Sequence, residues 1–212
     1  MVSERGPRPL SSHVNGQVCA TCNNGWMSSL DAGAQRVLLG STSTGVIAAD
    51  TAEVLARWLI KVVVNLNVTQ PYRLLVPEED RHGLAYGIPA SFAVDLFRVR
   101  QQNGLVDWVQ GFCGGLVMPI GMSIETQTSI AERTLVTHVR IADIVAVVVR
   151  LPYPMTVGHL PPADEIPRLW PLTATPLAWQ ALPVHDRYDS TMRVLRYTAP
   201  PSVFGEGIYR SF

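Results

Sequence analysis

Apolar residues recur every three or four positions in two stretches of the N-terminal third of the chain, a spacing typical of amphipathic helices. The first predicted helix begins at Asn23 or Asn24, either of which can cap it. It ends at Gly40, the residue type that stops helices in a left-handed conformation, and a loop follows over 41–45. Its apolar stripe consists of Met27, Leu30, Ala34, Val37 and Leu38.

The second helix has the stronger pattern. It is predicted to begin after Asp50 and to end within 65–67, before Pro71. Its broad apolar face consists of Val54, Leu55, Trp58, Leu59, Val62, Val63 and Leu66. We expect Trp58 to be a core anchor, with Arg57 and Lys61 reaching outward. A short third helix is predicted after Pro77, where acidic residues follow a proline suited to the first turn.

From Phe92 onward the pattern is typical of strands. Partial alternation over 92–100 and 105–112 predicts two strands, and Asn103-Gly104 between them is a hairpin signal. The run 133–151 is rich in β-branched residues and predicts one or two further strands, of which 144–149 is fully buried. We therefore expect an α+β fold in which an antiparallel sheet packs against the second helix.

Composition narrows the class of protein. The chain has 212 residues, 47% of them hydrophobic, which suffices for one domain with a core. A formal net charge of zero disfavours binding to nucleic acid by bulk electrostatics. Three cysteines do not suggest a disulfide framework, so a cytoplasmic location is expected. No apolar run approaches the roughly 20 residues that cross a membrane, and residues 1–17 do not resemble a signal peptide.

The most informative chemistry is the pair Cys19 and Cys22. Two thiols separated by two residues can bind one metal ion from a tight turn, but a structural zinc site takes four ligands. His13, Cys113 or a second copy of the chain are the candidates for the others. Two interpretations remain open: a zinc site, or two reduced thiols packed under the first helix. A thioredoxin-like redox motif is disfavoured, because no strand is predicted before the pair.

The run from Cys19 to Ser28, Cys-Ala-Thr-Cys-Asn-Asn-Gly-Trp-Met-Ser, resembles the second half of the zinc-bearing treble-clef module in bacterial and phage HNH endonuclease-like proteins. Asn23, Asn24 and Trp26 match its motif. The helix with Trp58 and Lys61 and the later Trp170-Pro171 are also similar. The resemblance covers roughly the first seventy residues and is diffuse beyond them.

Full-length members of that family also carry an earlier Cys-x-x-Cys and an acidic-His motif, which this sequence does not contain. The resemblance therefore implies that a catalytic HNH site is not encoded whole here, and no catalytic residue is assigned. None of His13, His82, His138, His159 and His185 lies in the acidic-His context. We also expect Met1 to be a late start of a longer natural product.

These observations predict four parts: an extended arm (1–17), a partial zinc knuckle with its helix as a treble-clef remnant (18–45), an α+β core (46–151) and a Pro-rich segment packed on the core (152–212). Two functions are expected. The first is a non-catalytic, HNH-derived accessory or interaction protein that binds a protein partner or DNA, or forms a homodimer. The second is an HNH-type metal-dependent endonuclease whose catalytic half lies outside this chain.

Overall fold

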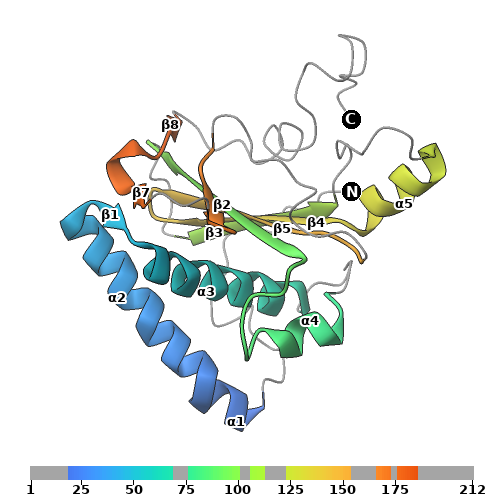
Figure 1. Cartoon of the computed structure of the whole chain (residues 1–212), viewed down its shortest axis with the longest axis horizontal. Helices are drawn as coiled ribbons and strands as arrows, with labels where there is room; N and C mark the ends of the chain where they lie inside the picture. Colours follow the sequence, from blue (N-terminus) through green and yellow to red (C-terminus); the bar gives the residue numbers. More distant parts are fainter. Residues whose placement is uncertain are drawn as a thin grey trace.

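The computed structural model describes residues 19–68, 76–100, 106–112, 123–153, 166–172 and 176–185; of 40–44, 106–112, 127 and 131 it describes the backbone alone. The expected α+β class is confirmed, with the helices that precede the sheet in the sequence on one face of a mostly antiparallel sheet (Figure 1). The described part of the chain begins with α1 (Ala20–Cys22), the turn η2 (Asn23–Met27) and α2 (Ser28–Thr44), which run on as one kinked helix. Then follow β1 (Val46–Ile47), α3 (Ala49–Val68) and α4 (Glu78–Gly83).

The main sheet has the strand order β3-β4-β5-β2-β6. Its strands are β2 (Phe92–Val99), β3 (Val106–Phe112), β4 (Leu135–Ile141), β5 (Ile144–Arg150) and β6 (Arg168–Trp170). All these neighbours pair antiparallel, and β8 (Val184–His185) pairs parallel with β2. Away from this sheet, β1 pairs with β7 (Leu177–Ala178), and the 3₁₀ turn η4 (Trp179–Ala181) follows β7.

The predicted hairpin between the first two strands is wrong. β2 pairs with β5 over the whole stretch from Phe92 to Arg98, and β3 pairs with β4, so β2 and β3 are not neighbours. Asn103-Gly104 lies outside the described residues. The hairpin lies instead between β4 and β5, where Ala142 takes a φ of 54° and Asp143 completes the turn. β4 and β5 are rich in β-branched residues and buried on both faces. They therefore pair with each other, and β5 also pairs with β2, in spite of the hairpin signal at Asn103-Gly104.

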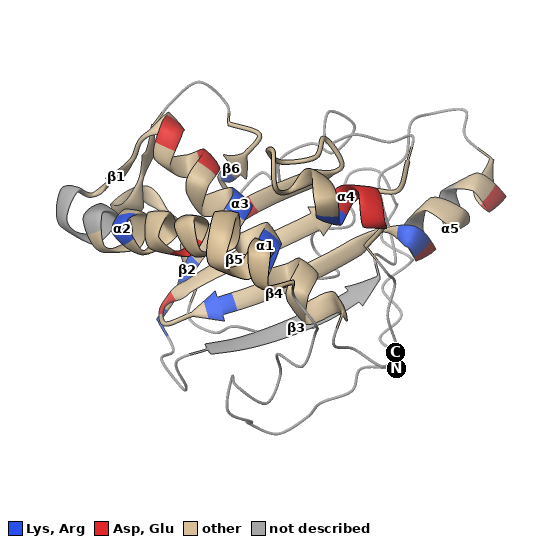
Figure 2. Cartoon of the chain, turned by 90° about the horizontal axis from the view of Figure 1, so that it is seen from below, with Lys and Arg blue, Asp and Glu red and all other residues tan. Residues whose placement is uncertain are grey.

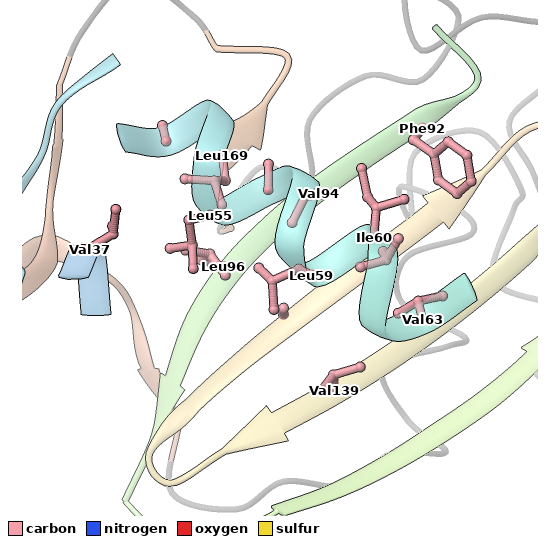
Figure 3. Close-up of a cluster of buried hydrophobic side chains, with 14 of the residues drawn as sticks. Val37, Leu55, Leu59, Ile60, Val63, Phe92, Val94, Leu96, Val139 and Leu169 are labelled. Carbon is pink, nitrogen blue, oxygen red and sulfur yellow. The ribbon is translucent and has the colours of Figure 1, made fainter. Parts of the chain in front are cut away.

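The apolar face of α3 explains how the helices attach to the sheet. Leu55, Leu59, Ile60 and Val63 are buried, and they point toward the strands, where Val94, Leu96 and Val139 lie (Figure 3). Side chains at every second position of a strand share one face, so these strand residues form the floor beneath α3. At roughly 25 cal/mol per Å² of buried apolar area, each large side chain here stabilises the fold by about 2 kcal/mol. The prediction that the second helix packs on the sheet is confirmed.

The first helix is longer than expected. α2 continues through Gly40 to Thr44, and the left-handed stop falls at Gly45, whose φ is 72°. A Cβ atom at Gly45 would lie 2.5 Å from the Gln180 side chain. The Gly45 carbonyl accepts a hydrogen bond from the Trp179 N–H at 2.7 Å. The left-handed φ is strained for any residue with a side chain, so it favours glycine at residue 45, where the helix ends.

The opposite face of the sheet is also buried. Its apolar residues come from β2, β4 and β5 and are joined by Ile130 of α5 (Ile124–Arg133), a helix that the sequence pattern did not predict. The Ser123 hydroxyl accepts a hydrogen bond from the Thr126 N–H at 3.2 Å and so caps the start of this helix. Figure 2 shows few charged residues on the strands, whereas α4 and α5 carry acidic residues at their starts. No helix in the described ranges has the length and apolarity needed to cross a bilayer.

The Pro-rich segment contributes strands rather than loop alone. β6, β7 and β8 all lie in it, and Leu169, Trp179 and Leu182 are buried in the same core cluster as the apolar face of α3. Strands of two or three residues are too short to show a period of two, which is why the pattern predicted an irregular wrap here. The domain boundaries proposed from the sequence stay a prediction, and the arm over 1–17 lies outside the described residues.

One ion pair ties the short strand β6 to the sheet. Asp95 of β2 is fully buried, and Arg168 donates to it through Nε at 2.8 Å and Nη2 at 3.2 Å. Burial raises the pKa of Asp95 to about 6, although the hydrogen bonds and positive charge of Arg168 oppose this rise. Desolvation of the carboxylate thus outweighs the attraction of its partner.

This pKa predicts a pH-dependent stability. Between pH 3.8 and about 6, folded Asp95 retains a proton that the unfolded chain has lost, so the free energy of unfolding falls as the pH rises through this window. The fall is at most about 3 kcal/mol. We expect Asp95→Asn to be less stable overall, because Arg168 loses its counter-charge, and to lack this slope. Urea unfolding from pH 3.5 to 7 measures both.

The matched control is Glu53→Gln, at an exposed position of α3, which is expected to keep the wild-type profile. A wild-type free energy of unfolding that rises relative to Asp95→Asn across the same window would contradict the assignment.

Candidate functional site

The two cysteines lie on the first turn of the kinked helix. Cys19 is the N-cap of α1, and its sulfur accepts a hydrogen bond from the Cys22 N–H at 3.0 Å. The Asn23 N–H donates to the Cys19 carbonyl at 2.9 Å, which closes the turn. The Cys19 side chain is exposed and that of Cys22 is half-buried. A single helical turn therefore presents both sulfurs on one accessible side, as the spacing predicted.

The two thiols differ in acidity. A hydrogen bond from the Cys22 side chain lowers the pKa of Cys19, and the Cys22 backbone N–H acts in the same direction. The same bond to Cys19 raises the pKa of Cys22, with burial and the nearby Cys19 charge as further causes, while a hydrogen bond from the Trp26 side chain lowers it. Cys19 is therefore the sulfur that ionises first, with Cys22 as its donor.

The capping role expected for Asn23 or Asn24 is wrong. Both asparagines are exposed and lie in η2, one turn inside the helix, because the Cys19 sulfur already caps its start. Within η2, Gly25 has φ −98° and ψ −113°, and the backbone kinks there. Here the kink separates the cysteine turn from the straight part of α2.

Trp26 holds the kinked turn against α3. The guanidinium carbon of Arg57 lies 5.5 Å from the centroid of the Trp26 ring, which is a cation–π contact. The Nε of Arg57 also donates to the Leu84 carbonyl at 2.7 Å. Arg57 therefore joins three segments: the cysteine motif, α3 and the turn after α4.

A second contact joins α2 to α3 one turn further along. Asp31 accepts hydrogen bonds from Trp58 Nε1 at 2.8 Å and from the Lys61 ammonium group. Lys61 was expected to reach outward, but its side chain is 9% exposed. A cation buried to this degree needs a counter-charge, and Asp31 supplies it. Trp58 is both packed against the core and bonded to Asp31.

Asp31 and Lys61 are the site residues that sequence analysis did not assign. The available signal was the placement of Trp58 and Lys61 three positions apart, which puts them on one side of α3. Only the crossing of α2 over α3 shows that Asp31 faces that side.

Further metal ligands are not assembled in the part of the chain that the structure describes, which contains no group of three or more His, Cys, Asp or Glu side chains suited to a metal. His13, Cys113 and His159 lie outside the described residues. Of the remaining histidines, His82 is exposed beside Glu78 at 3.8 Å, His138 is buried in β4 as expected of a sheet residue, and His185 lies on β8. The structure therefore brings together Cys19, Cys22 and Trp26.

Comparison of the chain with protein-family models, with curated proteins and with solved structures found no match.

We expect that removing the Asp31 contacts lowers the free energy of unfolding. Asp31→Ala leaves the buried Lys61 cation without this partner and removes the acceptor of Trp58. Because Asp31 is itself about half-exposed, we expect a loss of about 1–3 kcal/mol in the free energy of unfolding. Chemical denaturation measures it. Glu53→Ala removes an exposed acid from α3 and is expected to change stability by less than about 0.5 kcal/mol.

If Asp31→Ala and Glu53→Ala are equally stable, Asp31 does not hold the two helices together. The double variant Asp31→Ala/Lys61→Met removes the buried cation as well and is expected to recover part of the loss.

Proposed function

We propose that this chain is a non-catalytic interaction protein of HNH-derived type, in which Cys19 and Cys22 supply two thiolate ligands to a structural zinc ion. The remaining ligands come from residues outside those described or from a protein partner. The observation that carries this proposal is the presentation of two adjacent, accessible sulfurs on one turn that is anchored to the core.

The donor set fits half of a zinc site. Zinc prefers thiolate and imidazole ligands in a tetrahedral arrangement, and a two-residue gap between cysteines is its usual spacing. The Cys22 N–H that donates to the Cys19 sulfur is the kind of backbone bond that stabilises a thiolate. A bound zinc ion would supply a fixed link between this turn and whatever carries the other ligands.

The anchoring contacts support a structural rather than a mobile site. Trp26 connects the turn to Arg57, and Asp31 connects the same helix to Lys61 and Trp58. A metal ligand needs its orientation fixed by the groups behind it, because those groups set the position of the donor atom.

Two observations support a protein partner and a non-catalytic role. The whole chain is electrically balanced, whereas non-specific binding to nucleic acid depends on many basic contacts. Metal-assisted phosphodiester cleavage also needs a base near the metal, and among the residues described no histidine joins the cysteines in a ligand-sized group. The resemblance of the run from Cys19 to Ser28 to a treble-clef half supports the zinc site itself.

Metal content tests the proposal. Native mass spectrometry of the reduced chain after exposure to equimolar Zn²⁺ is expected to show tightly bound zinc, and Cys19→Ser/Cys22→Ser is expected to lose it. Cys113→Ser is the matched control: if it retains zinc, Cys113 is not a ligand. One zinc per two chains would assign the missing ligands to a second copy.

Wild-type protein that binds no more zinc than the double variant would contradict the zinc site. Mg²⁺-dependent or Mn²⁺-dependent cleavage of plasmid DNA by the purified chain would contradict the non-catalytic role.

A further inference from the structure

We propose that a low-molecular-weight disulfide such as glutathione disulfide oxidises Cys19 and Cys22 to a reversible intramolecular disulfide. We further propose that this oxidation prevents the pair from binding metal. The loss of metal binding rests on the proposed function, because the disulfide forms between the two sulfurs that we propose as zinc ligands. The chemistry of the disulfide depends only on the geometry of the two sulfurs.

The backbone places the two residues within disulfide range. They stand three positions apart on one closed helical turn, so helix geometry separates their Cα atoms by about 5 Å. Disulfides form between cysteines whose Cα atoms are about 4.4–6.8 Å apart. The Cys22 N–H already lies 3.0 Å from the Cys19 sulfur, so closing the disulfide needs a change of side-chain rotamer and no change of fold.

Access differs between the two sulfurs and sets the order of events. Cys19 is exposed and Cys22 is half-buried beside Trp26, so the oxidant reaches Cys19 first. The Cys19 thiolate attacks the oxidant, forms a mixed disulfide and displaces one small thiolate. Cys22 then attacks the Cys19 sulfur, its proton passes to the medium, and the second small thiol leaves. The pair loses two electrons and two protons, and one oxidant molecule becomes two thiols.

The surroundings leave the pair open to this reaction. The Cys19 side chain is exposed, so a small disulfide can reach its sulfur. A disulfide is not a thiolate, so oxidation removes both zinc ligands at once. The absence of a thioredoxin-like βαβ context argues against an oxidoreductase enzyme, but a switch requires only that its own two sulfurs react.

The test uses the full chain in glutathione buffers of graded oxidised fraction, with free thiols blocked by alkylation before digestion. The tryptic peptide that ends at Arg36 contains Cys19 and Cys22 and no other cysteine. As the oxidised fraction rises, we expect the doubly alkylated peptide to be replaced by an unalkylated form that is two hydrogens lighter than the free dithiol peptide. Reduction before alkylation is expected to restore the doubly alkylated form. Cys22→Ser is expected to stop at a mixed disulfide on Cys19. Cys19→Ser is expected to take up glutathione more slowly.

Zinc binding by the same samples separates this inference from the function on which it rests. The switch predicts that zinc retention falls in step with disulfide formation. Reduced protein that binds no zinc would overturn the proposed function while leaving the disulfide result intact. A peptide whose thiols both stay alkylatable in excess glutathione disulfide, or a disulfide form that retains zinc as the reduced form does, would overturn the switch.

Discussion

A buried lysine sets the arrangement of the helices. Lys61 lies in the middle of α3, where the surrounding face packs on the sheet, and its ammonium group bonds to Asp31 of α2. Because an unpaired cation at this position would be costly, α2 must cross α3 where Asp31 can reach it. That crossing also places Trp26 over Arg57 and so determines where the cysteine turn sits.

The cysteine turn is thus the exposed end of a chain of contacts that begins in the core. Its outward sulfurs remain accessible, while Trp26 and Asp31 restrain the helix behind them. A restrained helix that carries two accessible sulfurs suits a metal site whose remaining ligands come from other residues or from a partner protein. Cys19 is exposed, so the accessibility on which we base the proposed metal binding is also the basis of the proposed control by oxidation.

Sequence patterns predicted the features that depend on residues close together in the chain. The apolar face of α3 is a periodic feature, and the structure confirms it. The spacing of Cys19 and Cys22 is also local, and the structure places both residues on one turn. The pairing of β2 with β5 and the bond from Lys61 to Asp31 join residues 30 or more positions apart. Neither leaves a periodic trace in the sequence, so Asn103-Gly104 was interpreted as a hairpin and Lys61 as a surface residue.

The central claim is that these two sulfurs bind zinc, and X-ray absorption at the zinc edge of the reduced, zinc-loaded chain tests it most directly. The account predicts at least two sulfur ligands at about 2.3 Å, both lost in Cys19→Ser/Cys22→Ser. A zinc shell made only of oxygen and nitrogen, unchanged in that variant, would contradict it.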